Sequence, residues 1–205
     1  MELVLASRNR DKIGEIRHIL NGISVTIWTF LDFPGFPEVE EVGDTLAENA
    51  LLKAQAICDY TGKPALADDS GLEVDALGGA PGVYSARYAG IDVTYEDNNK
   101  KLLRELEGVP EEARTARFRC VLALVEPGGT RRTVEGVCEG HIVGGTRGTG
   151  GFGYDPLFVP EGETRTFAEM PAAQKNRISH RYRALKQARE LLRTREVEGG
   201  GGNHG

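Results

Sequence analysis

The chain has 205 residues, the length of one domain, and 40% of them are hydrophobic, which argues against a wholly disordered protein. Its 25 Lys and Arg residues stand against 31 Asp and Glu residues, and the net charge of −6 argues against a dedicated nucleic-acid binder. Three cysteines without a C-x-x-C pair indicate neither a disulfide framework nor a zinc site. Since no apolar run is long enough to span a membrane, we expect a cytoplasmic protein that binds neither nucleic acid nor membrane.

The spacing of apolar residues predicts an alternation of strands and helices in the first half of the chain. In order, we expect a strand at 3–6, a helix that starts at Asn9 or Asp11 and ends at Asn21, a strand at 23–28, a loop at 34–41 with an acidic edge, a helix from Thr45 to Thr61, and a strand at 63–67 that is interrupted by a turn at 68–71 and resumes at 72–74.

The second half contains fewer helices and a hairpin. We expect a helix at 94–106, strands at 118–126 and 132–143 joined by a turn at 127–129, a glycine-rich loop at 146–155, a strand at 157–159, and a helix from Ser179. Because a hairpin breaks a purely parallel scheme, we expect an α/β protein with a mixed sheet. Residues 1–195 are interpreted as a single domain of two lobes, and residues 196–205 as a disordered tail by composition.

The segment Ser7-Arg8-Asn9-Arg10-Asp11-Lys12 connects a predicted strand to a helix. Free amides and the helix dipole favour an anion at such a position, and Lys12 could turn back toward it. The alternative is a capped turn with a surface lysine. Because the chain has no phosphate-binding loop of the G-x-x-x-x-G-K-[ST] type, this segment taken alone favours the capped turn.

Thr45 and Glu48 match the spacing of a helix capping box, which explains Glu48 without any function. However, Asn49 and Lys53 lie one turn apart beside Glu48, and a carboxylate next to an amide and a cation suits a site for a metal and a phosphate.

Asp68 and Asp69 follow three apolar residues and precede Ser70. Two adjacent acids at the end of a buried strand are costly without partners, and adjacent strand residues face opposite sides. One carboxylate would then face a site while the other braces it, with Mg²⁺ as the natural partner. A surface turn explains the same residues equally well.

Residues 148–153 match G-x-G-x-x-G but no helix follows them, so we reject a dinucleotide-binding fold. The glycines are interpreted as allowing the backbone close to a ligand, with Phe152 as a stacking face or, alternatively, a core residue. Lys175, His180 and Arg181 lie around the start of the last helix, where cations could bind an anion or a keto oxygen.

Taken together, the motifs closely resemble the inosine triphosphate pyrophosphatase family, and within it the bacterial dITP/XTP-hydrolysing branch. The motifs are Ser7-x-Asn9-x-x-Lys12, Glu48-Asn49-Ala50-x-x-Lys53-Ala54, Asp68-Asp69-Ser70-Gly71-Leu72, Gly82-Val83-Tyr84-Ser85-Ala86-Arg87-Tyr88-Ala89-Gly90, Gly151-Phe152-Gly153-Tyr154-Asp155-Pro156 and Ser179-His180-Arg181. One departure is Leu46-Ala47 after Thr45, where the family usually has an aromatic residue and an acidic or polar one.

The resemblance implies a mixed sheet in two lobes with a central groove, usually in a homodimer. It implies Mg²⁺-dependent hydrolysis of non-canonical purine nucleoside triphosphates to the monophosphate and pyrophosphate. It also implies that Asp69 is the proton acceptor and a metal ligand, with Glu48 as the second ligand. The implied substrate contacts are Ser7, Arg8, Asn9, Arg10, Asp11, Lys12, Lys53 and Ser70 at the triphosphate, and Phe152, Gly153, Tyr154, Asp155, Lys175, His180 and Arg181 at the nucleoside.

We expect His180 and Arg181 to donate to the 6-keto oxygen of the base, because the amino group of adenine would leave both donors unpaired. Two other functions remain open at this point: a Maf-like pyrophosphatase with another base specificity, and a nucleotide-binding module that does not hydrolyse its ligand.

Overall fold

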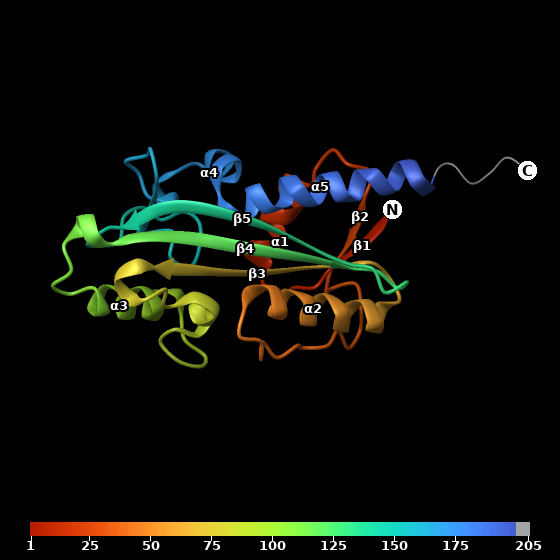
Figure 1. Ribbon diagram of the computed structural model, residues 1–205, viewed down its shortest axis with the longest axis horizontal. Coiled ribbons are helices and arrows are strands. Elements are labelled where there is room, and N and C mark those ends of the chain that lie inside the picture. Colours follow the sequence, from red (N-terminus) through yellow and green to blue (C-terminus); the bar gives the residue numbers. More distant parts are fainter. Residues whose placement is uncertain (200–205) are drawn as a thin grey trace, which may run out of the picture. The chain divides into compact units, whose positions relative to one another are not determined.

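The computed structural model describes residues 1–199, the last seven of them by backbone alone (Figure 1). The strands are β1 Glu2–Leu5, β2 Thr26–Trp28, β3 Ala65–Val74, β4 Thr115–Val125, β5 Arg131–Ile142 and β6 Phe158–Pro160. The α-helices are α1 Arg10–Ile19, α2 Leu46–Thr61, α3 Tyr95–Glu105, α4 Ala172–Ile178 and α5 His180–Gly199. Short 3₁₀ helices are η1 Asp75–Leu77, η2 Gly82–Arg87, η3 Glu111–Ala113 and η4 Phe167–Glu169.

The sheet is mixed. Its strands are hydrogen-bonded in the order β2-β1-β3-β4-β5-β6. β1 pairs in parallel with β2, where Leu3 lies opposite Ile27, and in parallel with β3, where Val4 lies opposite Ala65. β5 and β6 are antiparallel, with His141 opposite Val159. The predicted α/β class with a mixed sheet is therefore confirmed.

The chain divides into two compact units, and strands β3, β4 and β5 each contribute to both. The first unit comprises Met1–Asp69, Val121–Gly136 and the residues from Arg181 onward, and the second comprises Ser70–Cys120 and Val137–His180.

In the first unit, helices lie on both sides of the strands. Figure 1 shows α2 on one side of the strands and α5 on the other. The α5 residues Ala188, Leu191 and Leu192 line a narrow apolar crevice with Leu66 and Leu122 of the sheet. β1 is buried along Leu3–Leu5 because helices cover both of its faces, which explains its continuous apolar run.

In the second unit, a single apolar core joins β3, β4, β5, β6 and α3. Phe118 lies at its centre, with its ring centroid 4.7 Å from that of Phe158 and 6.0 Å from that of Phe167. Leu102 and Leu106, from α3 and its C-terminal end, are fully buried in the same core. This core supports the loop at 148–157, which carries several of the predicted site residues.

Side-chain caps explain where the helices begin. Asn9 accepts hydrogen bonds from the backbone amides of Asp11 and Lys12, so it is the cap of α1. The predicted capping box of Thr45 and Glu48 is present at α2, and Thr94 forms an equivalent box at α3.

β3 corrects one prediction. The expected turn at 68–71 does not interrupt the strand, which runs without a break through Asp68, Asp69 and Ser70. The two acids can remain in the buried strand because each has a cationic partner there. Position 71 is a glycine because the carbonyl oxygen of Gly82 lies too close to leave room for a side chain.

The bounds of three further elements differ from those expected from the sequence pattern. β2 is shorter than expected, and the helix α4 before Ser179 was not predicted. α5 extends to Gly199, so residues 196–199 of the expected tail are helical, whereas 200–205 lie outside the described residues. Among the described residues, no helix combines the length and apolar content needed to cross a bilayer.

Replacing Gly71 with Ala is expected to reduce the free energy of unfolding by about 1–3 kcal/mol, as overpacking typically does. The added Cβ would lie 2.4 Å from the carbonyl oxygen of Gly82. Urea denaturation measures the effect. The matched control is Gly128→Ala in the β4–β5 turn, where an added Cβ meets nothing within 4 Å. Equal unfolding midpoints for the two variants would contradict the assigned close approach.

Candidate active site

The loop between β1 and α1 carries the predicted triphosphate contacts. Asn9 holds the amides of Asp11 and Lys12 at 2.9 and 3.1 Å, so these two donors are already satisfied by the cap. Ser7 Oγ accepts from the amide of Asn9 at 3.2 Å. The guanidinium of Arg8 bonds the carbonyl oxygen of Phe36. The loop is therefore pre-shaped by its own side chains, and its contact with phosphate stays a prediction.

Asp68 is the centre of a buried charge cluster. Its side chain is fully buried, Lys12 Nζ lies 2.6 Å from Oδ1, and Arg181 Nε lies 2.7 Å from Oδ2. Arg181 also pairs with Glu15 of α1. Although burial raises the pKa of Asp68, the charges of Arg181 and Lys12 hold it well below the usual range of a carboxyl. Asp68 is therefore the bracing member of the acid pair.

Arg181 was predicted to contact the nucleobase. The structure instead gives its side chain, in a residue only 1% exposed, two carboxylate partners. Nothing in the sequence around Glu15 indicated that pairing, because the two residues are far apart in the chain. A contact of Arg181 with the base stays a prediction.

Asp69 has a different environment from Asp68. Its Oδ1 accepts a hydrogen bond of 2.7 Å from Lys53, whose ammonium also donates to Glu41 at 2.8 Å and to the backbone oxygen of Asp68 at 2.8 Å. Burial, with the nearby Glu41 carboxylate, raises the pKa of Asp69 against the opposing charges of Lys53 and Lys12. A carboxyl with a raised pKa is suited to accept a proton near neutral pH.

Asp69 and Glu41 offer oxygen ligands to a divalent cation. Asp69 Oδ2 is buried without a hydrogen-bond partner among the described residues, and such an oxygen is costly unless a ligand takes it up. Both carboxylates touch the same ammonium, so they lie close together. In the described part of the chain, no three acidic, His or Cys side chains gather to hold a metal. Water and phosphate oxygens would complete the shell, as is usual for Mg²⁺.

Glu48 forms the predicted capping box, and its role as a metal ligand stays a prediction. Its Oε2 accepts from the amides of Asp44 and Thr45 at 2.8 and 3.1 Å, as the capping box requires. The acid that the structure places beside Lys53 and Asp69 is Glu41, which the sequence showed only as part of an acidic loop edge.

In the second unit, an ion pair supports Phe152. Lys175 and Asp155 form a buried salt bridge, and Asp155 Oδ2 accepts from the amide of Phe152 at 2.9 Å. The ammonium of Lys175 lies 4.7 Å from the ring centroid of Phe152, within the range of a cation–π contact. Phe152 is half-buried, so one part of its ring is accessible for stacking.

The glycine-rich loop confirms the rejection of a dinucleotide fold, since no helix opens after Gly153. Its glycines approach the protein itself: a Cβ on Gly151 would lie 2.0 Å from Asp155 Oδ2, and one on Gly148 would lie 2.4 Å from the backbone of Ala168. At these two glycines the close approach is made to protein atoms, whereas a Cβ on Gly153 would meet nothing within 4 Å, and approach of a ligand there stays a prediction.

Tyr154 and His180 are both buried in the second unit. The hydroxyl of Tyr154 donates to the carbonyl oxygen of Ser85 at 2.9 Å, and burial raises the pKa of this phenol. The imidazole of His180 stacks on Phe118, with ring centroids 4.7 Å apart and planes at 12°. His180 is thus anchored by the core, and its contact with a base stays a prediction.

The predicted residues fall into two sets, one in each unit. The first unit holds Ser7, Arg8, Asn9, Arg10, Asp11, Lys12, Glu48, Lys53, Asp69 and Arg181, and the second holds Ser70, Phe152, Gly153, Tyr154, Asp155, Lys175 and His180.

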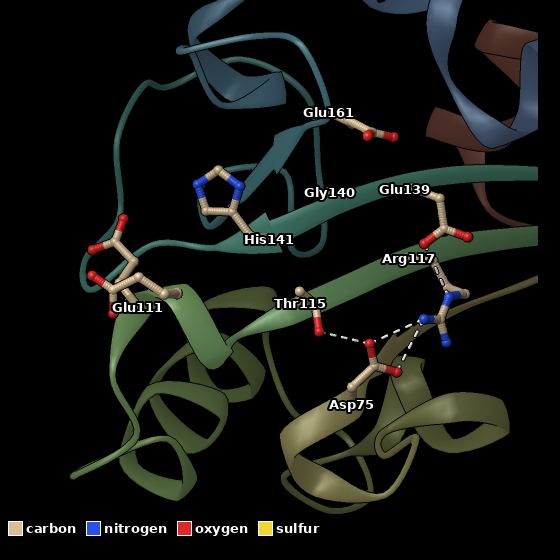
Figure 2. A pocket seen from close by; sticks show the side chains of 9 residues that line it. Asp75, Glu111, Thr115, Arg117, Glu139, Gly140, His141 and Glu161 are labelled. Carbon is tan, nitrogen blue, oxygen red and sulfur yellow. Dashed lines mark hydrogen bonds and ion pairs between the residues drawn. The ribbon is translucent and has the colours of Figure 1, made fainter.

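The second unit also has an open surface pocket of about 810 Å³ (Figure 2). Its Arg117 is held by Asp75 at 3.0 Å and by Glu139 at 3.1 Å, and Thr115 donates to Asp75. None of the predicted site residues lines this pocket.

Comparisons with known proteins agree with the predicted resemblance. The model of the Ham1 family matches residues 3–191. The chain is similar to a dITP/XTP pyrophosphatase of Desulforamulus reducens, with 55% identity over 192 residues, 94% of this chain and 96% of the relative. A dITP/XTP pyrophosphatase of Geobacter sulfurreducens is also 55% identical, over 196 residues, 96% of this chain and 98% of the relative.

Two solved structures share the fold. A HAM1 protein from Coxiella burnetii is similar with a TM-score of 0.87 and 42% identity, covering 95% of this chain and 99% of that one. The Ham1 protein of Staphylococcus aureus is similar with a TM-score of 0.85 and 38% identity, covering 95% and 100%. The predicted family resemblance is confirmed.

Replacing Arg181 with Ala is expected to reduce the free energy of unfolding by about 3–5 kcal/mol, because it removes one of the two cations paired with buried Asp68 and the cation paired with Glu15. The folded-state pKa of Asp68 lies below its unfolded value, so its contribution to stability is present above about pH 4 and is lost as pH falls through the folded pKa. Without Arg181 that pKa rises, so acid unfolding should begin at a higher pH.

Urea denaturation between pH 2 and pH 7 measures both effects. The matched control is Lys186→Ala, which removes an exposed cation from the same helix and should change stability by less than about 0.5 kcal/mol. An Arg181 variant as stable as this control would contradict the bracing role.

Proposed function

Because the chain belongs to the Ham1 family, we propose that it is a nucleoside triphosphate pyrophosphatase that removes dITP, ITP and XTP from the nucleotide pool. The products are the nucleoside monophosphate and pyrophosphate. The observation that carries the proposal is Asp69, a buried carboxyl with a raised pKa, an unpartnered oxygen and two lysines nearby. The names of the relatives support the substrate class. The match to the Ham1 family and the names of these relatives favour this function over that of a Maf-like enzyme.

Asp69 would accept the proton of the attacking water, because its raised pKa makes it a stronger base than an ordinary aspartate. Lys53 holds Asp69 Oδ1 in place and leaves Oδ2 unpartnered. Asp68 stays ionised through its pairs with Lys12 and Arg181, so it keeps Lys12 at the end of the β1–α1 loop. Lys12, Lys53 and Ser70 would supply donors and charge for the triphosphate.

Mg²⁺ is the cofactor we propose, with Glu41 and Asp69 as its protein ligands. When bound, the ion neutralises phosphate charge and makes the phosphorus more electrophilic. Lys53 orients both ligands, because its ammonium pairs with each of the two carboxylates. The carboxylate of Glu48 is instead used in the cap of α2.

The nucleoside would be recognised by the loop at 152–155 with Lys175, His180 and Arg181. The accessible part of the Phe152 ring provides a stacking face, and Asp155 with Lys175 fixes the loop behind it. A buried donor that pairs with the 6-keto oxygen would be left unpaired by adenine. We also propose a cytoplasmic homodimer, as the resemblance implies, which light scattering on the purified protein can check.

The test is product analysis by chromatography after incubation with XTP, dITP, dATP and dGTP, each with and without Mg²⁺. We expect monophosphate and pyrophosphate from XTP and dITP only, and only with metal. Binding without turnover would support a non-hydrolysing module, and release of orthophosphate would contradict the assigned bond cleavage.

Asp69→Asn is the decisive variant in that assay. It should lower turnover by at least about 100-fold, because the proton acceptor is lost. Since the folded pKa of Asp69 is raised, the wild type loses stability as pH rises from the unfolded pKa through the folded one. The Asn variant should lack this pH-dependent loss, which urea denaturation at several pH values measures. Asp59→Asn, on the exposed face of α2, is the control and should change neither property.

Glu41→Gln should weaken Mg²⁺ binding by at least about tenfold, since it removes one of two charged ligands. Glu48→Gln is the matched control on the neighbouring helix and should leave the affinity unchanged, because Glu48 is used in the cap. Calorimetric titration of the nucleotide-free protein measures both. The reverse result would restore Glu48 as the ligand.

A further inference from the structure

Helix α3 buries two adjacent asparagines, Asn98 and Asn99, together with Leu102. A buried amide is costly unless both of its polar atoms are paired. Asn98 meets this condition: its Oδ1 accepts from the amide of Ala89 at 2.8 Å, and its Nδ2 donates to the carbonyl oxygen of Ala86 at 3.1 Å. Asn98 is therefore explained by the packing of α3 against η2 and the segment that follows it.

Asn99 is only half satisfied. Its Nδ2 donates to the carbonyl oxygen of Gly153 at 3.0 Å, whereas its Oδ1 is buried and has no partner among the described residues. The residue is 5% exposed. A leucine of similar size would fill the position without an unpaired oxygen, so stability alone does not explain an asparagine here.

The bond from Asn99 ends in the loop Phe152–Asp155. Gly153 has a φ of +63°, a conformation that glycine adopts readily, so nothing in its own side chain fixes the peptide. A peptide is planar, and holding the Gly153 oxygen also fixes the direction in which the Tyr154 amide points. Asn99 thus determines which backbone groups the loop presents.

α3 also contacts the ring of Phe152. Tyr95 lies one turn before Asn99, and its ring centroid is 6.0 Å from that of Phe152. Further contacts hold the same loop from outside, among them the bond of Tyr154 to Ser85, the salt bridge of Lys175 with Asp155, and the bond from the amide of Ala168 to the carbonyl oxygen of Asp155. Among these contacts, the bond from Asn99 is the one that joins a side chain of α3 to the backbone of the loop.

We propose that Asn99 is a positioning residue for nucleobase selection, acting through Gly153 on the loop Phe152–Asp155. The inference rests on the proposed function, because it assumes that this loop contacts the base. Asn99 itself does not take part in the chemistry. Its loss should raise KM and reduce base discrimination while kcat changes little, since the proton acceptor and the metal ligands are untouched.

Asn99→Leu tests the proposal, because it keeps the volume and removes the unpaired oxygen together with the donor. We expect KM for XTP to rise about tenfold, kcat to change less than about threefold, and the preference for XTP over dGTP to fall. Leu103→Ala is the control: it removes a partly buried side chain of the same helix that makes only apolar contacts with the core. It should lower the melting temperature and leave both kinetic constants unchanged.

Hydrogen exchange of the peptide that contains residues 148–157 gives a readout independent of turnover. It should be faster in Asn99→Leu than in the wild type and in Leu103→Ala. Kinetic constants and exchange that match the wild type would overturn the proposal. A wild-type protein without turnover would instead overturn the proposed function, and the exchange measurement would still decide whether Asn99 holds the loop.

Discussion

The buried charge of Asp68 is the constraint on which the first unit depends. A carboxylate with no exposed side-chain surface costs several kcal/mol unless cations meet it. Lys12 comes from α1 and Arg181 from α5, so the pairing joins two helices to β3. Glu15 balances the remaining charge of Arg181. The packing of these elements therefore depends on all four charged side chains being present. The same packing holds Lys12 in the first turn of α1, next to the β1–α1 loop.

The neighbouring acid has the opposite character, and the strand geometry explains why. Successive residues of a strand face opposite sides, so Asp68 and Asp69 meet different cations although they are adjacent in the chain. Cations lower the pKa of Asp68, whereas burial and Glu41 raise that of Asp69. One carboxyl is thereby committed to structure and the other is available to accept a proton, a separation of roles typical of paired acids in enzymes.

Features determined by local chemistry could be predicted from the sequence. A cap at Asn9 or Asp11, the box at Thr45 and the absence of a helix after Gly153 follow from short-range geometry; the structure places the cap at Asn9 and contains the other two features. The unbroken β3, the proximity of Glu41 to Asp69, and the pair of Glu15 with Arg181 depend on residues distant in the chain. No spacing rule brings such residues together. For the same reason the sequence singled out Glu48, whose motif is local, and showed Glu41 only as part of an acidic loop edge.

In the glycine-rich loop, the glycines at positions 148 and 151 have a different physical reason from the one the sequence suggested. The sequence suggested that glycine lets the backbone approach a ligand, but Gly148 and Gly151 leave room for Ala168 and Asp155 of the protein itself. These contacts, with the salt bridge of Lys175 and Asp155, fix the loop before any ligand arrives. A loop that is already ordered loses little entropy on binding. The shape of the loop then depends on the anchors behind it, and one of these anchors is a buried amide on α3.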